Sequence, residues 1–137
     1  NSHEYFGHKY NVSNNIKDEL NLLAKNFKIL KENKNFFTKD LEKYIYLNNK
    51  NHLINLNILN FTINTKLKFE DFSKTLSRIL KSKIKRFNID GKYLMENGMN
   101  QGLSMGKVLK EIEEEWIKNN FKISKERVRE IIRLHLN

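Results

Sequence analysis

The sequence contains no cysteine and no proline, and only five glycines occur among its 137 residues. Without cysteine, neither a disulfide nor a thiolate metal site can form. No apolar run approaches the roughly 18 residues that suggest a membrane helix, so we expect no membrane span and no membrane partner. The first residues show no signal-peptide pattern and no initiator Met, so we interpret the chain as a fragment of a longer protein. We expect an intracellular protein, and the choice between cytoplasm, nucleus and organelle stays open.

Basic residues outnumber acidic ones and are unevenly distributed. The chain has 26 Lys and Arg against 16 Asp and Glu, for a formal net charge of +10. Residues 61–89 carry 8 basic and 2 acidic side chains, so their net charge is +6. A basic middle segment indicates a surface for phosphates or another anion. The alternative is a compositional bias, with 21 Lys and 21 Asn against 5 Arg, that merely covers a solvated helix face.

Apolar residues recur at helical spacing along most of the chain, which predicts an all-α fold of about six to seven helices. We expect residues 1–15 to be poorly ordered, residues 16–86 to form a helical body-like region, and residues 87–137 to form a helical tail-like region. The expected helices cover residues 16–27, 36–47, 53–61, 69–84, 92–97, 102–118 and a final segment after Ser124. Residues 53–61 alternate in part and are ambiguous with a strand, but their neighbours favour a helix.

The helix expected over residues 69–84 has an apolar and a basic face. Its apolar face comprises Phe69, Phe72, Leu76, Ile79, Leu80 and Ile84. Its opposite face holds Lys74, Arg78, Lys81 and Lys85, with Lys83 and Arg86 nearby. The pattern therefore predicts a basic stripe opposite the core stripe.

Local signals mark the ends of several other helices. Asn35 or Thr38 could cap the helix over residues 36–47, and Gly98 is the expected C-cap of the short helix over 92–97. Ser124 is a good N-cap for the last helix. The expected inner faces of the last two helices comprise Val108, Leu109, Ile112 and Trp116, and then Val128, Ile131, Ile132 and His135.

No residue pattern in this chain indicates a catalytic centre or a metal site. The four Asp residues include no D-x-D pair, so a two-carboxylate metal site is not expected. His3 and His8 lie near the N-terminus, His52 in an expected connector and His135 in the last helix, without zinc-binding spacing. The run 113–115 of three Glu is interpreted as a solvated face. We predict no catalytic residue, metal ligand or cofactor in this chain.

Four of the five glycines, Gly91, Gly98, Gly102 and Gly106, lie close together, seven, four and four residues apart. Gly102 and Gly106 are one helical turn apart, so they would leave a bare groove on one side of a helix. A neighbouring helix could pack there, or a phosphate backbone could approach the helix N-terminus. Tyr93 and Trp116 are more typical of a core than of a stacking surface.

Residues 87–116 nevertheless resemble part of a known family. The pattern is Phe87-Asn88-Ile89-Asp90-Gly91-x-x-Leu94-x-x-x-Gly98-x-x-x-Gly102-x-x-x-Gly106-x-x-Leu109, followed by Trp116. It is similar to the C-terminal region of the class II CCA-adding enzymes, which are tRNA nucleotidyltransferases, and of the related bacterial poly(A) polymerases. The segment 119–126 resembles the end of eukaryotic members, and residues 22–37 more weakly resemble a helix-turn-helix of the family.

The resemblance implies that this chain is the helical body and tail of a longer enzyme. In that family the catalytic head holds the carboxylates and uses Mg with CTP and ATP, and no residues here match the head. The body and tail dock the elbow of tRNA, so the implied partners are tRNA and the head of the same polypeptide, with a homodimer left open. The implied RNA-binding residues are Lys81, Lys83, Lys85, Arg86, Gly91, Lys92, Gly98, Gly102, Ser104, Gly106 and Lys107. Only the glycines match the family pattern; the others follow from charge and position.

Three hypotheses result. The first is a tRNA-binding portion of a CCA-adding enzyme, and the choice between CCA and poly(A) addition by the parent stays open. The second is a helical protein–protein interaction or scaffold module with a basic surface. The third, a free-standing enzyme, is disfavoured because no carboxylate cluster is present.

Overall fold

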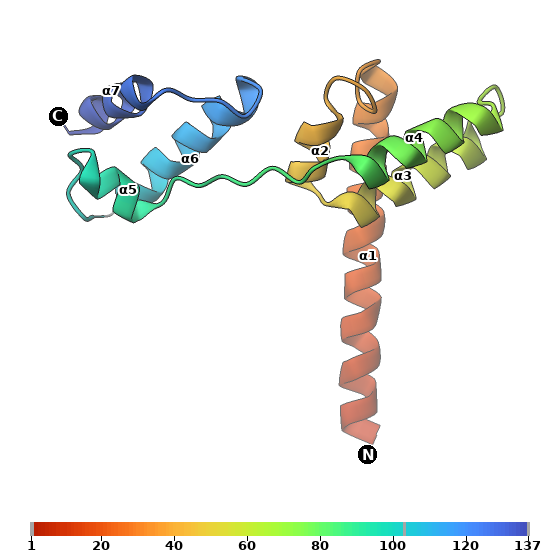
Figure 1. The fold of residues 1–137 in the computed structure, drawn as a ribbon. Helices are drawn as coiled ribbons and strands as arrows, with labels where there is room; N and C mark the ends of the chain where they lie inside the picture. Colours follow the sequence, from red (N-terminus) through yellow and green to blue (C-terminus); the bar gives the residue numbers. More distant parts are fainter. Residues whose placement is uncertain (1, 103, 137) are drawn as a thin grey trace. The chain divides into compact units, whose positions relative to one another are not determined.

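The computed structural model describes residues 2–102 and 104–136, with side chains described from residue 14 onward. Its described residues form seven α-helices and no strand, which confirms the all-α prediction (Figure 1). The helices are α1 (Ser2–Glu32), α2 (Leu41–Leu47), α3 (Lys50–Ile63), α4 (Phe69–Lys81), α5 (Gly91–Glu96), α6 (Ser104–Lys118) and α7 (Lys125–His135). None of the described helices is long and apolar enough to cross a membrane.

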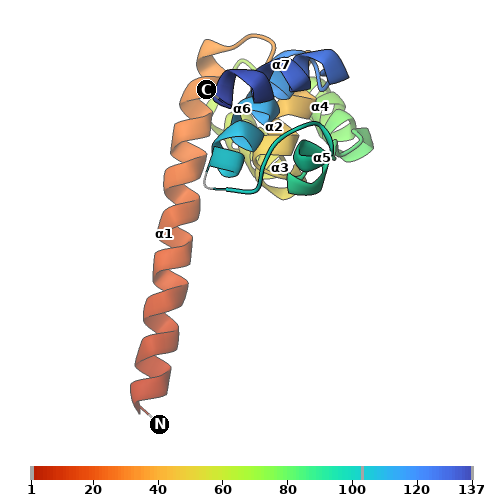
Figure 2. The same ribbon diagram turned by 90° about the vertical axis from the view of Figure 1, so that its left-hand side faces the viewer.

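The chain divides into two units, each with its own core. Unit 1 is Asn1–Ile84 and unit 2 is Lys85–Asn137. The division lies within the extended segment 82–90, which also contains the boundary expected after residue 86. Helix α1 is continuous in both views and includes residues 2–15 (Figures 1 and 2). The expected poor order of residues 1–15 stays a prediction.

The core of unit 1 is built from α2, α3, α4 and the turn before α2. Its buried members are Phe36, Leu41, Tyr44, Ile45, Leu53, Leu56 and Ile79. Helix α1 contributes Leu23, Phe27 and Leu30 to its edge. Helix α3 confirms the helical interpretation of residues 53–61. Its Asn57 is 1% exposed and donates from Nδ2 to the Phe72 carbonyl at 3.1 Å, so this buried amide also ties α3 to α4.

Helix α2 begins at Leu41, and the prediction that it starts near Phe36 with an Asn35 or Thr38 cap is wrong. Asn33 accounts for the difference: its Oδ1 accepts from the backbone N–H of Asn35 at 2.9 Å, and its Nδ2 donates to Asp40 Oδ2 at 2.9 Å. Such side-chain bonds compete with helix formation. The resulting turn lets Phe36 stack on Tyr44, with ring centroids 4.0 Å apart.

His52 lies in α3 and not in a connector, which corrects the expectation from the sequence. Its side chain is buried, and its Nε2 lies 2.8 Å from Asn26 Nδ2 on α1. Because an amide nitrogen donates, His52 Nε2 accepts and the imidazole is neutral. Asn26 Nδ2 also donates to Asn48 Oδ1 at 3.1 Å, so one amide joins α1 to two sites around the start of α3. Burial lowers the pKa of His52, and the charge of Glu19 partly opposes this shift.

Acidification should therefore destabilise unit 1 through His52. A lowered folded-state pKa means that unfolded His52 takes up its proton at a higher pH than folded His52. Its contribution is complete above the ordinary pKa of 6.5 and is lost as the pH falls toward the folded-state pKa. The Tm of the wild type should fall between about pH 7.5 and pH 5.5 more than that of His52→Gln, which keeps an acceptor but does not titrate. Equal pH dependence of the two proteins would contradict this role, and His135→Gln is the matched control.

The predicted apolar face of α4 is only partly correct. Ile79 is fully buried, but Phe69, Leu80 and Ile84 are exposed. The helix ends at Lys81, because Ser82 adopts an extended conformation and its Oγ donates to the Arg78 carbonyl at 2.7 Å. Lys50 Nζ also donates to the Leu80 carbonyl at 3.0 Å. These bonds satisfy carbonyls of the last turn, which would otherwise lack partners.

Unit 2 packs α5, α6 and α7 around a second core, and its two longer helices agree with the predicted ranges. Its buried residues are Leu94, Met99, Val108, Ile112, Val128, Ile131 and Ile132. Ser124 caps α7 as predicted, because its side chain accepts from the Arg127 N–H at 3.1 Å. His135, expected on the inner face, is instead exposed, and its Nε2 lies 2.6 Å from Glu111 Oε2.

The end of α5 explains Gly98, whose φ is +103°. The Gly98 N–H donates to the Met95 carbonyl at 3.2 Å, and the Met99 N–H donates to the Leu94 carbonyl at 3.0 Å. This pair of bonds is the Schellman motif, which requires a left-handed residue after the helix. Leu94 and Met99 are both in the core, so the turn also completes the packing of unit 2.

Candidate nucleic-acid interface

The predicted basic stripe does not form one helical face. Lys81 is the last residue of α4, and Lys83, Lys85 and Arg86 follow it in the extended segment. Lys81 and Lys83 belong to unit 1, whereas Lys85 and Arg86 belong to unit 2. The predicted helix was too long because the basic and apolar periodicity continues past Ser82. The helix itself ends before Ser82, whose side chain bonds the Arg78 carbonyl.

Unit 2 has a cleft of about 390 Å³ with an aromatic floor. Trp116, near the end of α6, packs against Phe87 from the extended segment, with ring centroids 5.2 Å apart. Phe121 packs on Trp116 edge-on at 5.0 Å. Tyr93 of α5 also lines the cleft. The cleft therefore combines rings from the extended segment, α5, α6 and the turn after α6.

A reversal of the chain after α6 brings Phe121 back to Trp116. Asn120 and Phe121 have φ of 58° and 63°, and the Phe121 N–H donates to the Trp116 carbonyl at 2.7 Å. Asn tolerates this left-handed conformation, but it is uncommon for a bulky residue such as Phe121. Asn119 supports the turn by donating from Nδ2 to the Lys122 carbonyl at 2.9 Å. The sequence predicted that Asn119 and Asn120 end the helix, but it did not predict the position of Phe121.

Three cations lie near these rings. Lys85 Nζ lies 5.7 Å from the centroid of the Phe121 ring, a cation–π contact. Arg86 and Lys122 line the cleft and are exposed. None of the described residues that line the cleft is acidic. The cleft therefore offers ring surfaces for a base and positive charge for a phosphate.

The other predicted site residues of unit 2 lie toward the start of α6. Gly91 begins α5 and is close to Met105, since a Cβ on Gly91 would lie 2.8 Å from Met105 Sδ. Lys92, Gly98, Gly102, Ser104, Gly106 and Lys107 are all exposed. From Met105 to Trp116 the helix rises by roughly 16 Å, so Gly102 and Gly106 lie toward the opposite end of α6 from Trp116.

Gly102 and Gly106 leave open space in unit 2. A Cβ added at either position would meet no atom within 4 Å among the described residues. The described part of the chain thus places no helix in the groove that these glycines were expected to form. The sequence left two alternatives for these glycines, packing of a helix and approach of a ligand. The local geometry leaves room for a ligand.

Part of the acidic side of α6 is used for packing, which corrects the interpretation of residues 113–115 as a purely solvated face. Arg127 Nε donates to both carboxylate oxygens of Glu115, at 3.0 and 2.8 Å, and its guanidinium also contacts Glu130. The hydrogen bond from Arg127 lowers the pKa of Glu115. This pair joins α6 to α7.

Among the described residues, no group of three or more His, Asp or Glu side chains could hold a metal ion. Trp116 is buried, as expected of a core residue, and the feature that the sequence did not predict is that Phe87, Tyr93 and Phe121 join it at one cleft. The available signal was Phe121 directly after an Asn-Asn pair and before Lys122.

No family model, curated protein or solved structure matches this chain. The resemblance to the CCA-adding enzymes therefore stays a prediction.

Proposed function

We propose that this chain is an RNA-binding module, the portion of a CCA-adding tRNA nucleotidyltransferase that docks the elbow of tRNA. The observation that carries the proposal is the aromatic and basic cleft of unit 2. Proteins recognise unpaired RNA bases by stacking them on aromatic side chains and hold the backbone with basic ones. A tRNA elbow, where two loops meet, presents both groups.

The proposed contacts have separate roles. Tyr93 and Phe121 provide ring surface at the cleft, and Arg86 and Lys122 attract the adjoining phosphates. Toward the start of α6, Lys107 is exposed next to Gly106, where a phosphate backbone has room to approach, and Lys92 is exposed on α5. Contacts of this kind read the shape and charge of RNA more than its sequence.

Nucleotide addition itself belongs, in this proposal, to a catalytic head elsewhere in the parent polypeptide. The head would supply the carboxylates that hold Mg and would bind CTP and ATP. The role of this chain is to position the tRNA so that its 3′ end reaches that head.

A second candidate function, a protein-interaction module, is favoured by one feature of α1. Ile16, Leu20, Leu23, Phe27 and Leu30 follow one another at spacings of four and three residues, which is the repeat of a helix–helix seam. Leu23, Phe27 and Leu30 pack against the core of unit 1, whereas Ile16 and Leu20 are 53% and 59% exposed. The uncovered end of this stripe could contact the catalytic head or a second subunit.

The test is binding to a full-length tRNA that lacks its CCA end, over a series of salt concentrations. A minihelix with the same acceptor stem but no elbow is the RNA control. The wild type should prefer the tRNA, and its affinity should fall steeply with salt because phosphate contacts release counterions. Equal binding to both RNAs would contradict elbow docking, and failure to bind either would favour the interaction module.

Charge reversal locates the contact. Arg86→Glu with Lys122→Glu should weaken tRNA binding by about tenfold or more and lower the slope of log affinity against log salt by about two. Lys125→Glu with Arg133→Glu changes the net charge equally on exposed positions of α7 and should have a much smaller effect. Equal losses in both double variants would mean that only the overall charge matters. Circular dichroism of each variant should match the wild type.

A further inference from the structure

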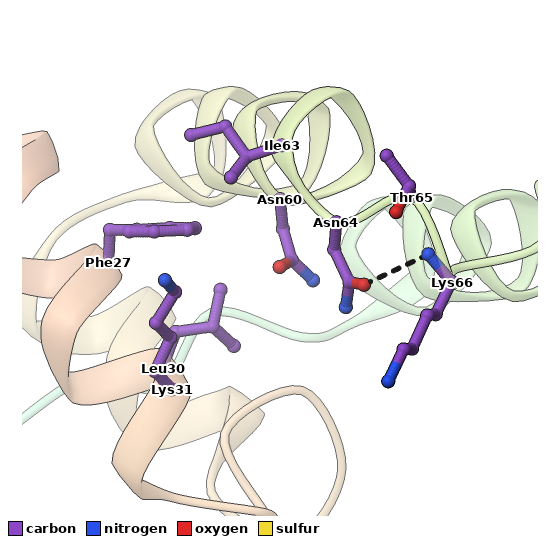
Figure 3. A pocket seen from close by; sticks show the side chains of 8 residues that line it. All are labelled: Phe27, Leu30, Lys31, Asn60, Ile63, Asn64, Thr65 and Lys66. Carbon is purple, nitrogen blue, oxygen red and sulfur yellow. Dashed lines mark hydrogen bonds between the residues drawn. The ribbon is translucent and has the colours of Figure 1, made fainter.

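A second pocket, in unit 1, is separate from the cleft assigned to RNA. Its volume is about 560 Å³, within the range of roughly 300–1,000 Å³ typical of small-molecule sites. It lies between the last part of α1 and the end of α3 with the turn that follows (Figure 3). None of its described lining residues is acidic.

One wall of the pocket is apolar. Phe27 and Leu30 project from α1, and Ile63 projects from the end of α3 (Figure 3). Ile63 is 52% exposed, so its side chain leaves apolar surface in water that a flat ligand could cover. This wall alone would suit any small apolar molecule.

The end of α3 supplies polar groups in a fixed arrangement. Helix α3 ends at Ile63, and the Asn64 N–H donates to the Asn60 carbonyl at 2.8 Å. Asn64 Oδ1 accepts from the Lys66 N–H at 3.2 Å, so the Asn64 amide keeps its Nδ2 hydrogens for another partner. The Asn60 carboxamide also lines the pocket, and in Figure 3 both amides point into the space that faces α1. Such carboxamides suit the edge of a nucleobase.

Two cations complete the site. Lys31 lies on the α1 side, with its Nζ 4.7 Å from the centroid of the Phe27 ring. Lys66 lies on the opposite side, and its side chain extends toward the same space (Figure 3). Two ammonium groups without an acidic lining residue favour a ligand that carries an anionic group.

We propose that this pocket binds a nucleotide, with its base against Leu30 and Ile63, its base edge at Asn60 and Asn64, and its phosphate beside Lys66, while Lys31 adds positive charge on the α1 side. Inorganic phosphate would leave the apolar wall uncovered, and a neutral apolar molecule would leave the amides and ammonium groups unused. The nucleotide can be a free nucleoside monophosphate or an unpaired nucleotide of an RNA. This site belongs to unit 1 and does not depend on RNA binding at the cleft of unit 2.

The experiment is a titration of the chain in which the backbone amide resonances are followed by NMR. The ligands, in separate arms, are each of the four 5′-nucleoside monophosphates and a short single-stranded RNA. Resonances of residues around α3's end and the following turn should shift. The matching nucleoside and inorganic phosphate should each bind at least about fivefold more weakly than the nucleotide, because each lacks one set of contacts. Binding in the mononucleotide arm identifies a free ligand, whereas binding only in the RNA arm identifies an RNA-borne nucleotide; either result supports the site.

Matched variants separate the site from general charge. Lys31→Gln with Lys66→Gln should weaken binding by about tenfold, and Asn60→Leu by about fivefold. The controls are Lys28→Gln on α1 and Asn55→Leu on α3, both at exposed positions. Each control should change the affinity for the nucleotide less than twofold. Arg86→Glu with Lys122→Glu removes the charge of the unit 2 cleft, so mononucleotide-induced shifts at the end of α3 that persist in this variant report the unit 1 pocket alone. Failure of this proposal and failure of the RNA proposal are therefore distinguishable. The proposal is overturned if no arm shifts these resonances, if inorganic phosphate binds as well as the nucleotide, or if the controls weaken binding equally.

Discussion

Replacing Leu53 by alanine should lower the free energy of unfolding of unit 1 by about 2–5 kcal/mol. Leu53 is fully buried in α3 and belongs to the core that joins α2, α3 and α4. The truncation removes apolar contacts and leaves a cavity that its neighbours fill only in part. Helix α3 also carries His52 and Asn57, so a shift of this helix would weaken two buried hydrogen bonds as well.

The same prediction tests the division of the chain into two units. The only tryptophan, Trp116, belongs to unit 2, so its fluorescence reports the unfolding of that unit. Leu53→Ala should lower the protection of unit 1 amides in hydrogen exchange and leave the Trp116 transition in place. Ile112→Ala, equally buried in unit 2, should do the reverse. If both variants shift both probes together, the two units unfold as one cooperative structure and the division has no energetic meaning.

Replacing Gly98 by alanine should destabilise unit 2 by about 1–2 kcal/mol, because a Cβ disfavours the left-handed conformation. Gly98 has a φ of +103° and carries the Schellman bonds that close α5. Gly98→Asn should cost less, since Asn tolerates positive φ better than other residues. The measurement is chemical denaturation followed by Trp116 fluorescence.

Gly102→Ala is the matched control for Gly98. It introduces the same methyl group at an exposed position where a Cβ meets no described atom within 4 Å. Its stability should stay within about 0.5 kcal/mol of the wild type. If Gly102→Ala lowers stability as much as Gly98→Ala, the loss at Gly98 cannot be assigned to its positive φ. That result would instead favour packing of a helix against the glycine groove.

Local sequence signals predicted α6, α7, the cap of α7 and the glycine after α5. Val108, Ile112 and Trp116 follow the helical period on α6, and all three are buried. Ser124 caps α7, and Gly98 follows the end of α5 with the positive φ that a C-terminal glycine permits. These features depend on residues within one or two turns, so the sequence contains the information directly.

The sequence was less informative where a distant partner decides the outcome. Asn33 bonds with Asp40 and Tyr44 delay the start of α2, and Lys50 reaches the end of α4 to bond the Leu80 carbonyl. The basic periodicity through Lys85 therefore predicted a longer helix than α4, which ends at Lys81. His52 and Glu115 were likewise assigned to a connector and to solvent, because their partners, Asn26 and Arg127, lie in other helices.

By itself, the sequence determined an all-helical, strongly basic chain without thiol chemistry, together with the cap of its last helix and most of the inner faces of its last two helices. Composition and short-range periodicity suffice for these properties, since each depends on side chains near one another in the chain. Only the tertiary structure decided that Phe87 and Phe121 meet at Trp116, and that Lys31 and Lys66 flank one pocket. Those residues converge because buried side chains and satisfied backbone groups fix how the helices pack within each unit, which no local pattern specifies.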